Sequence, residues 1–209
     1  MGIPVFLNIL LAPSGEYREP TLEEQNLIEQ AGVGNKVVIV EGLHFWGTSI
    51  AGYVNMFEFN DTVYIRPFGD KITDETVWMS KLIHETAHVY QKNTVSSENG
   101  FGWGYIFGLM NLNSISEDIY VGEDYNFGLV SFAGLERNAD CMSVILGSDK
   151  IQGINLTYTG EYEDCDSKNV VLAESIIQGN SLTSTEINIS ASNVEGFSNA
   201  NRTTRSFEK

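Results

Sequence analysis

Three residues in the middle of the chain have the types and spacing of a zinc-binding centre: His84, Glu85 and His88. In a helix, side chains four positions apart lie on one face, and their Cβ atoms are roughly 5–6 Å apart. Both imidazoles can then reach one zinc ion at about 2.0–2.1 Å. Glu85 is rotated by about 100° from His84, so its carboxylate lies beside the metal. From there it can take a proton from a zinc-bound water.

The same pattern also has a purely structural interpretation, in which two histidines are hydrogen-bonded inside a core helix. The chain has only 3 histidines, and two of them fall in the pattern. The other one, His44, lies in an aromatic patch, where packing is its more common role. The segment around the pattern carries the apolar residues that a buried helix needs: Val77, Trp78, Leu82, Ile83, Val89 and Tyr90. Because a zinc helix is normally buried, this composition favours the metal interpretation.

A catalytic zinc normally takes three protein ligands and keeps one position open, so one more ligand is required. No histidine follows His88, which leaves Glu, Asp and Cys as candidates. The best candidate is Glu136, on a predicted later helix, with Asp140 one turn further along the same face. In that geometry Glu136 binds the metal while Asp140 accepts a hydrogen bond from the far nitrogen of a ligand histidine. The alternative for Glu136 is an exposed helix carboxylate beside Arg137.

Composition excludes some classes of function. The 209 residues include 28 acidic and 12 basic side chains, a formal charge of −16. This charge argues against a nucleic-acid partner, because a phosphate backbone requires a cationic surface. No apolar run reaches the roughly 18 residues that suggest a membrane span. Cys141 and Cys165 form no metal or redox pattern, and the sequence leaves open whether they are bridged.

The sequence contains few signals for the cellular localisation of the protein. Residues 3–12 have the length of a signal-peptide core, but no basic residue precedes them. An opening β-strand is the favoured interpretation, and the expected localisation is cytoplasmic, or exported without a clear signal peptide. The oligomeric state stays open.

The elements that must position the histidines begin with a small sheet. Residues 36–40 are rich in Val and Ile, as a buried strand is. Residues 53–59 and 62–67 flank Asn60 and Asp61, which predicts a hairpin. Residues 62–67 are also a candidate sheet edge, to which an extended peptide can add as a strand. Residues 13–20 are predicted to be a loop.

The helices are predicted from caps and apolar periodicity. A capping box at residues 21–24 begins a helix that ends near Gly32. The helix that carries the histidines is predicted from an N-cap at Thr73 to about Lys92. The remaining expectations are a short helix or an extended rim over 103–110, loops over 93–102 and 111–125, helices over 128–146 and 167–178, and a strand over 151–158. The predicted class is α+β, with one domain over residues 1–179 and a polar tail over 180–209.

The combination His-Glu-x-x-His followed by Glu-x-x-x-Asp on a later helix resembles the glutamate-ligand zincins, the gluzincin group that includes the thermolysin-like proteases. The amino-acid sequence around the two motifs, LIHETAHVYQ and LERNADCM, also resembles small bacterial zincin-like proteins, some of them encoded near secretion and toxin systems. The match covers about residues 62–147 and is specific at the two motifs only. It implies a zincin-like fold, in which a small N-terminal sheet precedes an active-site helix and a second long helix carrying the third ligand.

The resemblance also implies roles for individual residues. It implies Zn²⁺ held by His84, His88 and Glu136, with Glu85 as general base and Asp140 hydrogen-bonded behind a ligand. A thermolysin-like enzyme supplies a downstream His or Tyr to the oxyanion, and no His follows the motif here. The candidate donors are therefore tyrosines, and the sequence does not choose among them: Tyr105, Tyr125, Tyr158 and Tyr162.

The predicted function is a zinc-dependent peptidase that hydrolyses a peptide or protein substrate, with Glu85 passing the proton of the attacking water to the leaving amine. The alternative is a catalytically weak or inactive zincin-like binding module in a bacterial secretion or toxin assembly. The intact Glu85 argues against this alternative, and so does the lack of an evident fourth protein ligand. Metal analysis combined with a peptide-library digest separates the two hypotheses.

Overall fold

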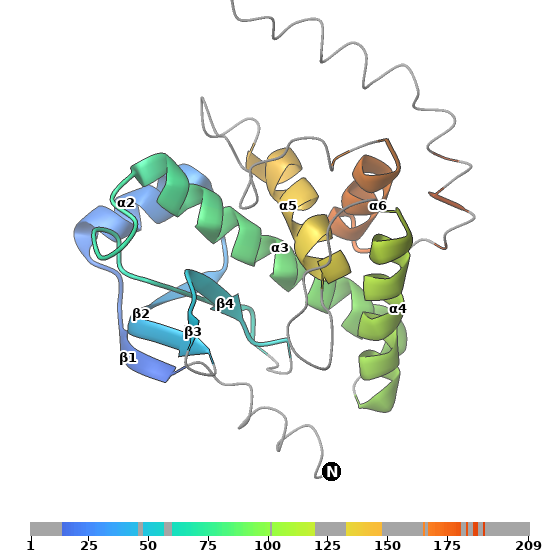
Figure 1. Ribbon diagram of the computed structural model, residues 1–209, viewed down its shortest axis with the longest axis horizontal. Coiled ribbons are helices and arrows are strands. Elements are labelled where there is room, and N and C mark those ends of the chain that lie inside the picture. Colours follow the sequence, from blue (N-terminus) through green and yellow to red (C-terminus); the bar gives the residue numbers. More distant parts are fainter. Residues whose placement is uncertain are drawn as a thin grey trace, which may run out of the picture.

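The computed structural model describes residues 14–45, 48–56, 60–100, 102–119, 133–147 and 167–180, with single positions at 165, 183, 186, 187 and 190. Within these residues the fold is α+β, as predicted, with a small mixed sheet and five helices (Figure 1). The elements are β1 (Ser14–Arg18), α2 (Leu22–Ala31), β2 (Lys36–Phe45), β3 (Thr48–Ser49), β4 (Gly52–Val54), β5 (Thr62–Ile65), α3 (Glu75–Asn99), α4 (Trp103–Ile119), α5 (Ala133–Gly147) and α6 (Ser167–Ile177).

The sheet has the strand order β1–β2–β5–β4, and β3 pairs with the end of β2. β2 and β5 run parallel, whereas β1–β2 and β4–β5 are antiparallel pairs. β4 and β5 pair antiparallel, as the predicted hairpin requires, with Tyr53 opposite Tyr64. The predicted turn at Asn60 and Asp61 is wrong, because β4 ends at Val54 and its register with β5 leaves a longer connection. Because β5 has a strand on each side, the prediction that residues 62–67 form a sheet edge is wrong. Among the described strands, β4 is the edge on that side of the sheet.

At the N-terminal end of the described chain, one prediction is confirmed and one is wrong. The capping box begins α2, because Thr21 Oγ1 accepts from the Glu24 N–H at 3.3 Å and the Glu24 carboxylate accepts from the Thr21 N–H at 2.8 Å. Gly32 ends the helix at φ 64°, a conformation that costs glycine little. Residues 14–18 form β1 and not a loop, with Tyr17 opposite Val40. This exposed edge strand lacks the apolar alternation by which a strand is found.

The helix that carries the histidines, α3, starts one residue later and ends later than predicted. Its N-cap is Asp74 and not Thr73, since Asp74 Oδ1 accepts from the N–H of Val77 at 2.9 Å. At the other end the helix continues past Lys92 to Asn99. The prediction of a loop over residues 93–102 is therefore wrong for residues 93–99.

Packing against the rest of the protein explains the extra turns of α3. Thr94 and Val95 are buried, and Thr94 Oγ1 donates to the carbonyl oxygen of Ile176 in α6 at 3.0 Å. β-branched residues are weak helix formers, so tertiary contact, not intrinsic propensity, holds this segment helical.

The segment after α3 is also more helical than predicted. α4 covers residues 103–119, so the choice left open at 103–110 resolves to a helix, and the loop predicted over 111–125 is wrong up to Ile119. Its buried side chains, Leu109, Leu112 and Ile115, recur at helical spacing. α5 and α6 lie within or one residue beyond the helices predicted over 128–146 and 167–178.

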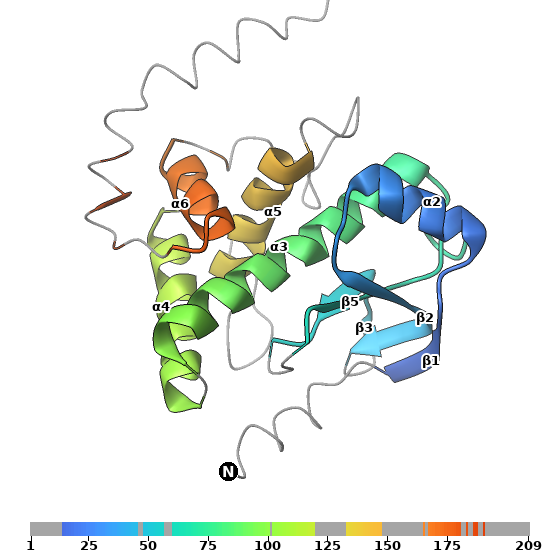
Figure 2. The ribbon, with the colours of Figure 1, turned by 180° about the vertical axis from the view of Figure 1, so that it is seen from behind.

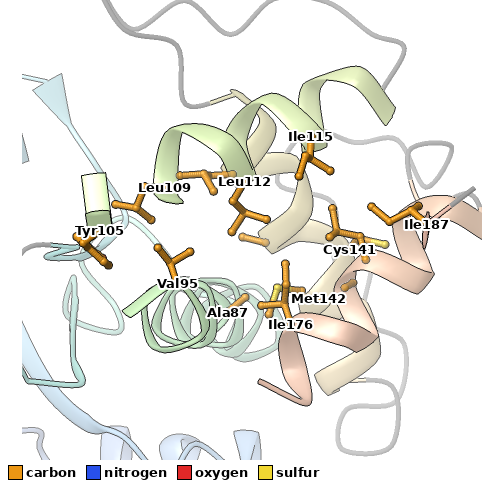
Figure 3. Packing of buried hydrophobic residues seen from close by; sticks show 14 residues of the cluster. Ala87, Val95, Tyr105, Leu109, Leu112, Ile115, Cys141, Met142, Ile176 and Ile187 are labelled. Atoms are coloured by element: carbon orange, nitrogen blue, oxygen red, sulfur yellow. The ribbon is translucent and has the colours of Figure 1, made fainter. Parts of the chain in front are cut away.

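Buried apolar side chains form two clusters, and α3 contributes to both. The sheet cluster joins α2, the sheet and the first half of α3, and Trp78 is its largest fully buried member. The helical cluster joins the second half of α3 to α4, α5 and α6 (Figure 3). Both overall views show α3 running from the sheet side to the helical side (Figures 1 and 2). In the helical cluster Cys141 is paired with Cys165 in a disulfide, which answers a question that the sequence left open.

The remaining predictions fall outside the described residues. They are the strand over 3–12, the helix start at 128–132, the strand over 151–158 and most of the tail over 180–209. The domain boundary at residue 179 stays a prediction. None of the described helices is long and apolar enough to cross a membrane.

Candidate metal centre

The two histidines of the motif lie together on α3, as their spacing predicts. Their rings are buried, with 6% and 8% of His84 and His88 exposed, and the ring centroids are 5.0 Å apart. The rings meet edge to face, at an interplanar angle of 84°. α5 packs against this face of α3 (Figures 1 and 2). Any group on the facing side of α5 therefore stands opposite the imidazoles.

Glu136 of α5 is that group. Its Oε2 lies 3.2 Å from Nε2 of His84 and 3.5 Å from Nε2 of His88. One ligand atom from each of the three residues lies within 4.8 Å of the other two. Ligand atoms about 2.1 Å from a tetrahedral zinc stand roughly 3.4 Å from each other, so the carboxylate–imidazole distances fit such a centre. The Glu136 side chain is 44% exposed, which leaves one side of the cluster open to solvent.

Asp140, one turn after Glu136, supports one of the two imidazoles. Nδ1 of His84 lies 2.7 Å from Asp140 Oδ1. A carboxylate can only accept, so the His84 Nδ1–H donates this bond, and Nε2 on the other side of the ring faces Glu136, where a metal ion would take the place of its proton. This is the arrangement that the Glu-x-x-x-Asp spacing predicts. The structure thus brings together His84, His88, Glu136 and Asp140 from two helices.

The electrostatics of the cluster favour positive charge at its centre. Partial burial opposes the charge on Glu136, but His88 and His84 outweigh it and hold the pKa of this carboxyl well below its usual range. Burial also disfavours the imidazolium of His84, yet Asp140 and Glu136 raise its pKa well above the ordinary value. Burial also lowers the pKa of His88, but Glu136 outweighs burial and raises this pKa above its ordinary value. A divalent cation would replace the protons that these acceptors attract.

Glu85 lies beside the cluster and against the edge strand β4. A Cβ placed on Gly52 of β4 would stand 2.5–2.8 Å from Cγ, Oε1 and Cδ of Glu85, so only a glycine leaves room for the carboxylate. Burial raises the pKa of Glu85, although the imidazoles of His84 and His88 pull it down. A carboxyl group with a raised pKa near a metal-bound water is suited to proton transfer.

Tyr105 and His44, both considered in the sequence analysis, make contacts within the fold and lie outside the metal cluster. Tyr105, a candidate oxyanion donor, is buried, and its hydroxyl donates to the carbonyl oxygen of Met56. His44 contacts the carbonyl oxygen of Gly42 on its own strand and does not belong to the metal cluster. The other candidate tyrosines, at 125, 158 and 162, lie outside the described residues.

Sequence reasoning missed three residues at the site. Gln91 contacts His88, and its position three residues after this histidine was a usable signal. Lys81, one turn before Glu85, has a pKa lowered by burial to about 8, against the attraction of Asp140 and Glu85. Its helical spacing was a signal as well. For Gly52 no local signal exists, because its contact joins a strand to a helix.

Comparison with known proteins identifies no relative of this chain: no family model matches it, and neither does any curated protein or solved structure.

Proposed function

We propose that the protein is a zinc-dependent peptidase of the glutamate-ligand type. The observation that carries the proposal is the convergence of two imidazole nitrogens and one carboxylate oxygen at the spacing of zinc ligands. Two histidines and a glutamate are the donor set of hydrolytic zinc, and three protein ligands leave a position for water or substrate. When bound, the ion supplies a water of lowered pKa and a charge that polarises a carbonyl oxygen.

The proton transfers belong to Glu85. Its carboxylate takes the proton of the attacking water and then donates it to the leaving amine. The raised pKa of Glu85 favours the first step, because it makes the carboxylate a stronger base toward the water proton. Gly52, which has no side chain, leaves room for this carboxylate beside β4.

The substrate position proposed here is the edge of the sheet next to Glu85. β4 pairs with β5 on one side only, among the described strands, and its Gly52 lies against the general base. An extended peptide that adds to β4 as a further strand would hold its backbone carbonyl near the cluster. This mode of binding selects substrates that are unfolded or extended at the cleavage site.

The test combines metal analysis with digestion of a broad peptide library. The wild-type protein is expected to bind zinc with one ion per chain and to cleave peptides. Glu85→Gln should retain zinc and lose cleavage, because the amide cannot take the water proton. Glu75→Gln, the same change at an exposed position of the same helix, is the matched control and should cleave normally.

Each other outcome contradicts the proposal in a distinct way. A wild-type protein that binds no zinc refutes the metal centre itself. Zinc binding without cleavage refutes the peptidase and supports the alternative of an inactive binding module. Cleavage by Glu85→Gln at the wild-type rate refutes the assignment of the general base.

A further inference from the structure

The second ligand histidine, His88, is supported differently from the first. Its Nδ1 lies 2.8 Å from Oε1 of Gln91, one turn later on the same helix. Gln91 is 0% exposed and is among the largest fully buried side chains of the protein. Burying an amide with unmet hydrogen bonds is destabilising, so the partners of Gln91 define its role.

The amide of Gln91 finds all of these partners, and they fix its orientation. Nε2 of Gln91 donates to the carbonyl oxygen of Leu135 at 2.9 Å and to Oδ1 of Asn138 at 2.8 Å, both in α5. The Leu135 carbonyl is only an acceptor, so the nitrogen end of the amide must face α5. The oxygen end then faces His88. A flipped amide would place its oxygen against the carbonyl oxygen of Leu135, with two acceptors facing each other.

This orientation determines which nitrogen of His88 carries the proton. The Gln91 oxygen can only accept, so His88 Nδ1–H donates to it, and Nε2 is the nitrogen that faces Glu136 and would bind a metal ion there. His84 reaches the same tautomer through the carboxylate of Asp140. In both histidines Nδ1 is the nitrogen that donates and Nε2 is the nitrogen that faces Glu136. The acceptor is a charged carboxylate behind His84 and a neutral amide behind His88.

Gln91 also links the two helices that supply the ligands. The carbonyl that it contacts belongs to Leu135, the residue directly before Glu136. One side chain therefore holds the imidazole of His88 from α3 and the backbone next to Glu136 from α5. A glutamate could not take this place, because it has no N–H to donate to α5 and would add a negative charge beside Glu136 and Glu85.

We propose that Gln91 is a positioning residue of the metal centre, which sets the tautomer of His88 and the register between its helix and the Glu136 segment. The proposal rests on the proposed metal site, which it deepens with a residue outside the motif. Acceptors of this kind behind a ligand histidine change metal affinity about 10–100-fold when they are removed.

The test compares zinc affinities, measured by competition with a chromophoric chelator, in three variants. Gln91→Met keeps the length of the side chain but has no hydrogen bonds, and Gln91→Glu keeps only the acceptor. The matched control is Thr94→Val, which removes another buried hydrogen bond between α3 and a neighbouring helix, away from both imidazoles. The expected result is an affinity about 10–100-fold weaker for Gln91→Met, which removes the acceptor, and unchanged for Thr94→Val. Gln91→Glu should lie between Gln91→Met and the wild type, because it keeps the acceptor and loses the contacts to α5.

Equal affinity in Gln91→Met and the wild type would overturn the proposal. An equal loss in Thr94→Val would also overturn it, because the effect would then come from general loosening of the core. A second measurement covers the case in which the Gln91 variants fold poorly. Long-range nitrogen–proton NMR of the metal-free wild type, at a pH where His88 is neutral, is expected to show its proton on Nδ1.

The NMR measurement also separates this proposal from the proposed function. A proton on Nε2 would refute the role of Gln91 even if the protein cleaves peptides. A proton on Nδ1 in a protein that binds no zinc would support the role of Gln91 in setting the tautomer. The same result would refute the metal centre.

Discussion

Two glutamates of this protein, Glu24 and Glu136, have a lowered pKa, but the side chains around them differ. Glu24, in the first turn of α2, is 2% exposed, and short hydrogen bonds saturate its carboxylate. Arg18 donates to both of its oxygens at 2.7 and 3.0 Å, and the N–H groups of Thr21 and Phe68 donate at 2.8 and 3.1 Å. Burial opposes the charge, but these donors lower the pKa of Glu24.

Glu136 has a lowered pKa as well, yet its contacts are fewer and longer. The two imidazoles stand 3.2 and 3.5 Å from one of its oxygens, and 44% of the side chain is exposed. The comparison shows how a structural charge differs from one available for a ligand. Every lone pair of Glu24 is committed to the fold, whereas Glu136 keeps room for a cation among groups that already attract one.

The largest expected effect tests this difference directly. Glu136→Gln should weaken zinc binding about a thousandfold, because it removes one of three protein ligands and its charge. Glu24→Gln, the same substitution at the saturated carboxylate, should leave zinc affinity unchanged. Both are measured by chelator competition on folded protein. If Glu136→Gln binds zinc as the wild type does, the ligand assignment is wrong.

A second prediction concerns the space beside β4. Gly52→Ala should lower the rate of peptide cleavage about a hundredfold, because its Cβ displaces the Glu85 carboxylate by a distance of the order of 1 Å. Zinc content should not change, since no ligand moves. Gly34→Ala is the control, because a Cβ there meets nothing within 4 Å. A normal cleavage rate in Gly52→Ala would show that the carboxylate works from another position.

The third prediction sharpens the structural side of the comparison. Glu24→Gln should lower the free energy of unfolding by about 2 kcal/mol, because the guanidinium of Arg18 loses its buried counter-charge and one of its acceptors. The partial exposure of Arg18 keeps the loss below that of a fully buried pair. Urea unfolding measures it, with the exposed Glu23→Gln on the same helix as control. Equal stability in both variants would mean that the Glu24 network contributes little.

The last prediction needs no substitution and concerns the dependence of zinc affinity on pH. The pKa values of His84 and His88 are raised in the metal-free protein, so protons compete with zinc at pH values above 6.5, the ordinary histidine value. Affinity should rise with pH by about tenfold per unit for each proton displaced. The histidines stabilise the metal-free fold in the opposite direction, at low pH, and that contribution is lost as pH rises through their raised pKa values. An affinity that does not change from mildly acidic to mildly alkaline solution would contradict both statements.

The sequence predicted those parts of the site that depend on local geometry. The pairing of His84 with His88, and of Glu136 with Asp140, follows from helical spacing, and a later helix carrying a ligand was implied by the resemblance to zincins. Gln91 could have been placed next to His88 by the same spacing, but its two acceptors on α5 could not. The contact of Gly52 with Glu85 depends entirely on how the sheet meets α3.

The same distinction explains the errors in the fold. The last turns of α3 and most of α4 are helical because their buried faces pack on other helices, and the local sequence, rich in Ser, Asn and Gly, indicates a loop. The interior position of β5 depends on a parallel partner, β2, that lies far away in the sequence. Caps, by contrast, involve residues within one turn, so the capping box of α2 was predicted correctly.

The position of α3 has a consequence for how the protein unfolds. Its first half supplies Trp78, Leu82 and Ile83 to the sheet cluster, and its second half supplies Ala87 and Val95 to the helical cluster. Neither cluster can come apart without exposing part of this helix, and a helix that loses half of its packing is marginal in water. The two halves should therefore denature in a single cooperative transition, with the same midpoint for tertiary and helical signals.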